Sequence, residues 1–376
     1  MSAAEAIEVA PARTRRERLA FVRFPYRVYR GDPNWVAPLE LERLQFLDRK
    51  KNAWFDAGDA ELFLARRGGE VVGRIAAVED RRYNEFQGVK QGVFGMMECV
   101  DDREVASALF DAAQAWTRGR GLDGLLGPAG FSSNYEWSVL VDGFSGPPAV
   151  MMPYNPRYYP ALYEACGFRR ARDLYAWDLP ITPPGHAEAV AERLRRRGKV
   201  VVRPVNVKDR EEETRRALAI YNGAWAKNWG FVPMADREFR QMIADLEQFG
   251  DPELVLLAEV DGEPAAFTML LPDFNEALAR ARGRLFRWGL PVGLLKLLWG
   301  MRRIRRVRFV TLGVKEGFRK RGLEVLLVVE VLRAARRLGY RTCEVSWTLE
   351  DNDLINRATG YFGATRSKTY RVYQRP

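Results

Sequence analysis

Residues 308–340 of the 376-residue chain read RFVTLGVKEGFRKRGLEVLLVVEVLRAARRLGY. The run from Arg308 to Val314 has the composition of a strand, and the apolar segment that ends before Gly339 has that of a helix. A basic loop, residues 315–322, joins the two. Backbone N–H groups in the first turn of a helix lack intrahelical partners, and the helix dipole favours negative charge there. The stretch therefore predicts a phosphate-bearing ligand at Arg319–Gly322.

This loop resembles the acyl-CoA-binding motif of the GNAT superfamily, which reads Arg/Gln-x-x-Gly-x-Gly/Ala between a strand and a helix. Arg319 and Gly322 match the first Arg and the first Gly, whereas Glu324 stands where the family has Gly or Ala. The resemblance implies that acyl-CoA, or the thioester of an acyl carrier protein, binds here. The cofactor-binding residues that it implies are Leu312, Val314, Arg319, Lys320, Arg321, Gly322 and Leu323.

Two pairs of segments repeat along the chain. Glu61–Val78 and Glu253–Leu271 each read as an apolar strand, a Gly turn followed by Glu, and a second apolar strand, which predicts a hairpin. Asn155–Leu179 and Asn352–Gln374 each read as an Asn at a helix start, an aromatic-flanked helix, a Gly and an aromatic strand. The two pairs are offset by nearly the same number of residues, so a duplication is the simplest explanation.

The element order of each half is similar to that of a GNAT domain: helices, a hairpin, a β-α-β crossover and terminal strands. The resemblance implies an α/β (α+β) fold of two tandem GNAT-like domains, each a mixed, mostly antiparallel sheet flanked by helices. We place the domains at 1–180 and 195–376, joined by a Pro-rich linker at 181–194. The first half has acids, ECVDDREVAS, where its crossover helix begins. Since acids repel phosphate, we expect the first domain to lack the cofactor loop and to shape the acceptor site.

Composition excludes several classes of protein. The net charge of +11 favours an anionic partner without choosing one. We see no apolar signal segment and no uncharged apolar run near the length of a membrane span, so we expect a cytoplasmic protein. Cys99, Cys166 and Cys343 are far apart and read as reduced thiols. Because His186 is the single histidine, a catalytic His relay is improbable and a His-rich metal site cannot be built; we expect no metal.

Acyl transfer to an amine requires a proton acceptor for the amine, polarisation of the carbonyl and a proton for the leaving thiolate. The GNAT resemblance implies that backbone amides of the motif strand polarise the carbonyl, that Tyr361 is the acid and that Asn352 is the motif Asn. Glu344 is a base candidate, and Glu98 of the first domain is another that would point to a shared cleft. The alternatives are a helix-end aromatic for Tyr361 and a helix cap for Asn352.

Polar and aromatic residues also gather in YNGAWAKNWGFVPM, in FSSNYEW with MMPYNPRYYP, and in LPDFNEA. Asn and Trp at a helix end need hydrogen-bond partners, and binding sites collect such groups. The alternative is a set of core aromatics with turn-forming Asn and Pro. The acceptor-binding residues that we expect are Trp225, Asn228, Trp229, Asp273, Asn275, Asn134, Glu136 and Asn155.

An insertion at 277–308 contains nine Arg and one Lys without an acidic residue. Its apolar centre, Trp288–Met301, is too short to span a bilayer. Basic amphipathic segments with Trp at their edges lie in the interface of anionic membranes. We therefore expect a membrane-facing lid that uses residues 284–306. The alternatives are a helical hairpin packed on the domain with extended Arg side chains, or a nucleic-acid contact, which the aliphatic centre disfavours.

Together these features predict an N-acyltransferase that moves a long-chain acyl group from acyl-CoA or acyl carrier protein to the amine of a lipophilic acceptor. It would work as a peripheral protein on the inner face of the cytoplasmic membrane. Some bacterial tandem-GNAT proteins are ceramide-synthase-like, so the resemblance implies that a sphingoid base is a candidate acceptor. Two alternatives stay open: N-acetylation of a small amine or peptide with acetyl-CoA, and a non-catalytic acyl-CoA-binding protein in which Glu324 has disabled the loop.

Overall fold

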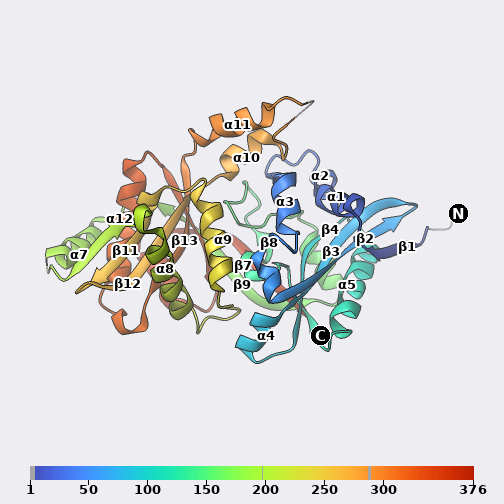
Figure 1. Cartoon of the computed structure of the whole chain (residues 1–376), viewed down its shortest axis with the longest axis horizontal. Coiled ribbons are helices and arrows are strands. Elements are labelled where there is room, and N and C mark those ends of the chain that lie inside the picture. Colours follow the sequence, from blue (N-terminus) through green and yellow to red (C-terminus); the bar gives the residue numbers. More distant parts are fainter. Residues whose placement is uncertain (1–4, 197, 287–288) are drawn as a thin grey trace. The chain divides into compact units, whose positions relative to one another are not determined.

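The computed structural model describes residues 5–196, 198–286 and 289–376, which divide into two compact units (Figure 1). The first unit comprises Met1–Leu174, Leu278–Leu295 and Lys368–Pro376, and the second comprises Tyr175–Ala277 and Lys296–Ser367. Each unit is thus assembled from separate stretches of chain, and the first takes in most of the insertion and the C-terminal residues. Among the described residues, no helix has both the length and the apolar composition of a membrane span.

The first unit contains a sheet in the order β1-β2-β3-β4-β5-β15, and β8 also pairs with β15. Neighbours are antiparallel except for β4 and β5, which are parallel. Helix α5 packs across β2 to β5 over an aromatic core that includes Phe94, Phe110 and Tyr163. The strands are β1 (Ile7–Pro11), β2 (Gly58–Arg67), β3 (Glu70–Asp80), β4 (Gln91–Cys99), β5 (Asp123–Gly127), β6 (Ala129–Gly130), β7 (Ser132–Trp137), β8 (Val139–Asp142), β9 (Arg169–Pro180) and β15 (Thr365–Arg375), of which β9 and β15 continue into the second unit.

The helices that lie within the first unit are α1 (Arg15–Arg23), α2 (Pro25–Val28), α3 (Glu40–Phe46), η1 (Ala53–Asp56), α4 (Arg81–Gln87), α5 (Arg103–Arg118) and α6 (Tyr159–Ala165). The predicted hairpin at residues 61–78 is confirmed as β2 and β3. One expectation for this half is wrong. Asn155 does not begin a helix: α6 starts at Tyr159, and the Asn155 amide instead binds the backbone of Leu140 in β8.

The second unit contains a sheet in the order β14-β13-β12-β11-β10. Again one pair, β13 with β14, is parallel and the others are antiparallel. Helices α12 and α7 pack together on the sheet, and α8 contacts β12 and β13. The elements are α7 (Gly185–Arg196), β10 (Val200–Pro204), η2 (Val207–Asp209), α8 (Arg210–Ala224), α9 (Asp236–Glu247), η3 (Pro252–Leu254), β11 (Val255–Val260), β12 (Glu263–Pro272), α10 (Asn275–Ala281), α11 (Val292–Met301), β13 (Arg306–Val314), η4 (Glu316–Phe318), α12 (Leu323–Arg337), β14 (Thr342–Leu349) and α13 (Asp353–Tyr361), with parts of α10 and α11 assigned to the first unit.

The quoted motif stretch folds as its pattern predicts. Helix α12 buries apolar residues from Leu323 through Leu332 against β12 and β13, because they recur at helical spacing. It ends at Arg337, and Gly339 follows with a φ of 91°, a conformation that suits glycine at a helix end. The second predicted hairpin is confirmed as β11 and β12. In the insertion, Arg287 and Trp288 lie outside the described residues, and the described part contains the end of α10, the short helix α11 and the start of β13.

Candidate functional site

The parallel strands β13 and β14 separate part-way along their length. Their shared register runs from Arg306–Thr342 to Phe309–Val345, whereas β13 continues to Val314 and β14 to Leu349. Opposite the other edge of β13, Met269 pairs with Thr311 and Leu270 with Phe309, so Val310 is the extra residue of a β-bulge. Beyond Phe309, β13 stays paired with β12, Leu312 with Thr268 and Val314 with Ala266, but its register with β14 has ended. Backbone groups on the β14 edge of β13 therefore lie outside the β13–β14 ladder.

The loop after β13 leads into a helix whose N-terminus carries no side-chain cap. Gly322, the N-cap residue of α12, has a φ of 80°, and no side-chain hydrogen bond caps this end within the described chain. Lys320 also has a positive φ, of 63°. Arg319, Lys320 and Arg321 are exposed, while the Leu323 side chain is fully buried and only its backbone can serve a ligand. First-turn N–H groups, which have no intrahelical partner, and three cations together suit a phosphate group.

The end of α8 lies over this loop. Arg319 donates through Nη2 to the Ala224 carbonyl oxygen at 2.9 Å. A Cβ on Gly313 would lie 2.6 Å from the ring of Trp225, so glycine is needed for that ring to pack on β13. The Asn228 N–H donates to the Trp225 carbonyl oxygen at 2.8 Å, and Trp229 follows in the same turn, half-buried. The structure thus brings one group of predicted acceptor residues next to the predicted cofactor loop.

The corresponding places in the first unit are filled. Asp102 caps α5, because its carboxylate accepts from the N–H groups of Glu104 at 2.8 Å and Val105 at 3.3 Å. Strands β4 and β5 also separate, after the Val93–Leu126 pair, but a Cβ on Gly95 would lie 1.7 Å from the Ala129 carbonyl oxygen. The chain of β6 therefore occupies the gap beside β4. Both the N-terminus of α5 and the gap beside β4 are thus occupied in the first unit.

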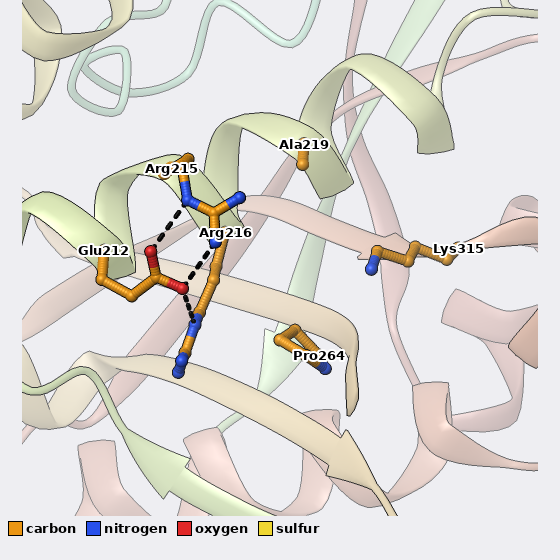
Figure 2. Close-up of a pocket in the computed structure, with 6 residues that line it drawn as sticks. All are labelled: Glu212, Arg215, Arg216, Ala219, Pro264 and Lys315. Carbon is orange, nitrogen blue, oxygen red and sulfur yellow. Dashed lines mark hydrogen bonds and ion pairs between the residues drawn. The ribbon is translucent and has the colours of Figure 1, made fainter. Parts of the chain in front are cut away.

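A shallow pocket of about 190 Å³ lies between α8 and the start of β12 (Figure 2). Its cations are already paired: Glu212 accepts from Arg215 Nη2 at 2.7 Å and from Arg216 Nε at 2.8 Å, as the dashed lines in Figure 2 mark. Lys315 lies 3.8 Å from Glu263. Because carboxylates neutralise these cations, the pocket is a poor phosphate site, and the α12 N-terminus remains the better one.

Two predicted residues, Asp273 and Glu344, meet at Arg306 of β13. Asp273 and Glu344 are both fully buried, Arg306 donates to Asp273, and Arg306 Nη1 lies 4.0 Å from Glu344 Oε2. Burial acts to lower the pKa of Arg306, but the two carboxylates raise it more, so the net pKa is raised and the guanidinium stays charged. As alternation predicts, Cys343 and Val345 instead pack in the α12 core. The side chains of β14 therefore place charge on one face of the sheet and apolar groups on the opposite face.

Helix α13 shows structural roles for its predicted residues. Asn352 is the N-cap, and its side chain accepts from the Ile355 N–H at 3.3 Å. Tyr361 is 42% exposed, and its ring lies edge-on to His186, with centroids 4.4 Å apart. Asn356, one turn into α13, binds the Leu349 and Glu350 carbonyls at 3.0 and 3.2 Å and accepts from Thr348. Asn356 thus fixes the turn between β14 and α13.

In the first unit, Glu98 forms a nearly buried polar cluster. Its carboxylate accepts from the Tyr29 hydroxyl at 2.9 Å and from the Tyr159 hydroxyl at 2.5 Å, and it lies 3.9 Å from Arg74. Burial raises the pKa of Glu98 to about 7, although Arg74 and the two hydroxyls oppose the shift. A carboxyl group in this state exchanges protons near neutral pH.

Replacing Glu98 by Gln should flatten the pH dependence of stability. The folded pKa of Glu98 lies above its ordinary value of 4.5, so its contribution is fully present below that value and is lost as the pH rises through 7, by up to about 3 kcal/mol. Urea unfolding of both proteins from pH 4.5 to 8 measures the difference. Glu104→Gln, at a carboxylate 79% exposed in the same unit, is the control. Equal pH slopes for wild type and Glu98→Gln would contradict the assignment.

The remaining predicted acceptor residues are scattered. Asn155 is buried and uses its amide on the backbone of Leu140 and Pro156. The Asn134 N–H donates to Ser132 Oγ at 3.1 Å, and the exposed Glu136 lies 4.0 Å from Arg43. Asn275 begins α10, and its N–H donates to Asp273 Oδ1 at 3.2 Å. Because the buried Asn155 amide already bonds to the backbone through both its oxygen and its nitrogen, the proposed site does not include it.

Sequence reasoning missed an equivalence between Tyr29 and Trp225. Each is the C-cap residue of a helix, α2 or α8, and each contacts the second-last residue of the crossover strand of its own unit. In the first unit that residue is Glu98, and in the second it is Gly313. The repeat pattern could have aligned Glu98 with Gly313, but nothing in the sequence links either one to its aromatic partner. Arg306 was missed too, because it looked like one of many insertion arginines.

Comparisons with known proteins agree with this geometry. No protein-family model matches the chain. The chain is 38% identical to the bacterial ceramide synthase of Caulobacter vibrioides, over 98% of this chain and 97% of that protein, and 36% identical to YghO of Escherichia coli, over 95% and 92%. A solved tandem GNAT protein from the clavulanic acid biosynthesis pathway matches 98% of both chains with a TM-score of 0.58 and 15% identity. The chain therefore belongs to the same family as bacterial ceramide synthase and YghO, and it has the tandem GNAT fold of N-acyltransferases.

Proposed function

We propose that this N-acyltransferase takes a long-chain acyl group from an acyl-CoA thioester and transfers it to the amine of a lipophilic acceptor at a membrane surface. The observation that carries the donor assignment is the uncapped N-terminus of α12, with Gly322 at a φ of 80°, beside the separation of β13 and β14. In the first unit Asp102 and the chain of β6 block both features. One donor site per chain follows. Acyl carrier protein, whose prosthetic group also bears a phosphate, stays an alternative donor.

The chemistry assigns each group a task. The thioester carbonyl would lie in the gap beside β13, where N–H groups outside the β13–β14 ladder polarise it. The amine nitrogen attacks the carbonyl carbon, the carbon–sulfur bond breaks, and the amine proton goes to a carboxylate while the thiolate gains a proton. Glu344 is the carboxylate that we assign to the acceptor face, and Arg306 holds it together with Asp273. Solvent is the first candidate for the proton that the thiolate gains. Tyr361, whose ring lies edge-on to His186, is the alternative donor.

Two observations support a lipophilic acceptor. The insertion exposes apolar residues on α11 within a segment rich in arginine. The relative from Caulobacter vibrioides is named for ceramide synthesis, and ceramide contains an N-acylated sphingoid base. A sphingoid base is therefore the first acceptor to test, and the anionic membrane surface that residues 284–306 would contact is the place where such a base resides.

The test is an assay of the purified full chain with mass-spectrometric detection of products. Palmitoyl-CoA, a palmitoylated carrier protein and acetyl-CoA are each combined with sphinganine or with a small polyamine. We expect an N-acyl lipid from palmitoyl-CoA and sphinganine, with product at least about a hundredfold above the acetyl-CoA and polyamine pairs, because a site built for an apolar chain discriminates by its buried methylenes. N-acetyl polyamine as the main product would favour the small-amine alternative. Saturable acyl-CoA binding without any product would favour the non-catalytic one.

A further inference from the structure

Helix α11 presents apolar side chains on two faces. Gly293, Leu297 and Gly300 are buried, whereas Leu295, Leu298 and Trp299 are 61%, 50% and 47% exposed. The exposed residues are spaced by three and four positions, so they share one face of the helix. Soluble proteins rarely leave a contiguous apolar surface of this kind uncovered unless it meets a partner.

The charges around this face fit an anionic partner. The sequence from residue 277 to residue 315 contains no Asp or Glu. Lys296, Arg302 and Arg303 are exposed on α11 or just after it, and the Arg303 guanidinium lies 3.7 Å from the centre of the Trp299 ring. Trp and Arg side by side are typical of the interface between lipid headgroups and acyl chains. A second protein copy would bring the same positive charge and repel it.

The segment before α11 is held by the N-terminal helices of the first unit. The Gly283 carbonyl oxygen accepts from the Glu40 N–H at 3.2 Å, and a Cβ on Gly283 would lie 2.3 Å from the Tyr26 hydroxyl oxygen. The Glu40 carboxylate, 15% exposed, accepts from Arg284 Nε at 2.9 Å and from Arg23 Nε at 3.0 Å. We call Tyr26, Glu40, Gly283 and Arg284 the clamp.

Two further contacts join the clamp to the helix. The Leu294 N–H, in the first turn of α11, donates to the Leu285 carbonyl oxygen at 3.0 Å, next to Arg284. A Cβ on Gly293 would lie 1.8 Å from the Arg284 carbonyl oxygen, so the helix packs directly on the clamped segment. The start of α11, up to Leu295, is therefore held by a segment that contacts α2 and α3.

We propose that the Leu295–Leu298–Trp299 face of α11 inserts into the interfacial layer of an anionic bilayer, and that the clamp holds the helix in the orientation that allows insertion. The proposal rests on the proposed function for the identity of the lipid that is acylated, but membrane binding itself requires no catalysis. Glu40 is in this view a positioning residue: it acts on the membrane contact through Arg284.

The first experiment measures binding of the full chain to vesicles by co-sedimentation, with phosphatidylcholine alone or mixed with phosphatidylglycerol. We expect binding only to the anionic vesicles, and a drop in partition of at least about tenfold for the double variant Leu298→Ser, Trp299→Ser. Leu354→Ser, at a leucine 78% exposed on α13, is the matched control and should bind like wild type. Insertion would be overturned if the double variant bound the vesicles as well as wild type does. It would also be overturned if added salt, but not the double substitution, removed binding, or if the chain self-associated through α11.

The second experiment tests the clamp. Glu40→Gln should lower vesicle binding several-fold and raise hydrogen exchange at residues 289–301, because Arg284 and Arg23 lose their shared carboxylate. Glu42→Gln, on the same helix and paired with its neighbour Arg43, should change neither. Acyl-CoA binding is measured in parallel for all variants. If the wild type binds acyl-CoA but not vesicles, this proposal is contradicted and the donor site is not. If the wild type binds vesicles but not acyl-CoA, the proposed function alone is contradicted. If Glu40→Gln and Glu42→Gln had equal effects on vesicle binding and hydrogen exchange, the role of the clamp would be contradicted.

Discussion

Replacing Gly322 by Asp should lower the affinity for acyl-CoA by at least about a hundredfold, because it places a negative charge where the phosphates would bind. It also forces a side chain into a backbone with a φ of 80°, and its Cβ would lie 3.0 Å from Leu194 Cδ1. Isothermal titration of the wild type should give one acyl-CoA per chain, since the equivalent helix in the first unit is capped by Asp102.

Two control variants separate the charge from the strain. Gly339→Asp makes the same substitution at a φ of 91°, just past the C-terminal end of the same helix, away from the proposed phosphate site at Arg319–Gly322. It should lose stability but keep its affinity for acyl-CoA. Gly322→Asn adds a side chain of similar size without charge, and Asn tolerates this conformation better than most residues, so it should give an intermediate affinity. Unchanged affinity for Gly322→Asp, or two equivalent sites in the wild type, would refute the donor assignment.

Replacing Asp273 by Ala should lower the free energy of unfolding by about 3–5 kcal/mol. The substitution removes a fully buried carboxylate from Arg306, which is itself only 20% exposed. Arg306 would then keep Glu344, at 4.0 Å, as its remaining carboxylate partner among the ion pairs of this cluster. A buried guanidinium with half its counter-charge is costly, because water cannot replace the lost partner.

Asp236→Ala is the matched control, since Asp236 also pairs with an arginine, Arg240, within the second unit but is 58% exposed. Exposed pairs contribute about 0–1 kcal/mol, so this variant should unfold almost like wild type. Urea unfolding followed by tryptophan fluorescence measures both, and added salt should shrink the effect of Asp236→Ala more than that of Asp273→Ala. Similar losses in the free energy of unfolding for the two variants would mean that water reaches the Asp273 cluster more readily than its burial indicates.

The two substitutions with the largest expected effects act on different properties: Gly322→Asp on donor binding and Asp273→Ala mainly on stability. Gly322→Asp should weaken donor binding by at least about a hundredfold in a chain that still folds. Asp273→Ala should weaken the second unit and reduce turnover through the position of Glu344. If Glu344→Gln, which keeps the shape of the side chain, lowers turnover more than donor affinity, then Glu344 acts on the chemical step.

Much of the fold was predictable because its signals are local. Hairpins with a Gly turn, the long apolar helix and its terminating glycine depend on neighbours in sequence, and all of them appear where expected. The helix start predicted at Asn352 is local as well and is confirmed, with Asn352 in the N-cap position that is the alternative to a catalytic role. Asn155 shows the limit: the same residue type in a similar pattern bonds to β8, because the backbone of Leu140, brought close by folding, offers it both a donor and an acceptor.

The sequence by itself determined the class of fold and the repeated order of elements, and it predicted a phosphate site at Arg319–Gly322, since periodicity, glycine positions and runs of charge are written along the chain. Only the tertiary structure decided that β6 fills the gap beside β4 in the first unit, that Arg306 joins Asp273 to Glu344, and that most of the insertion belongs to the first unit. Each of these depends on contacts between residues far apart in sequence, such as Glu40 with Arg284. Such contacts follow from which surfaces pack together, and no local pattern encodes that choice.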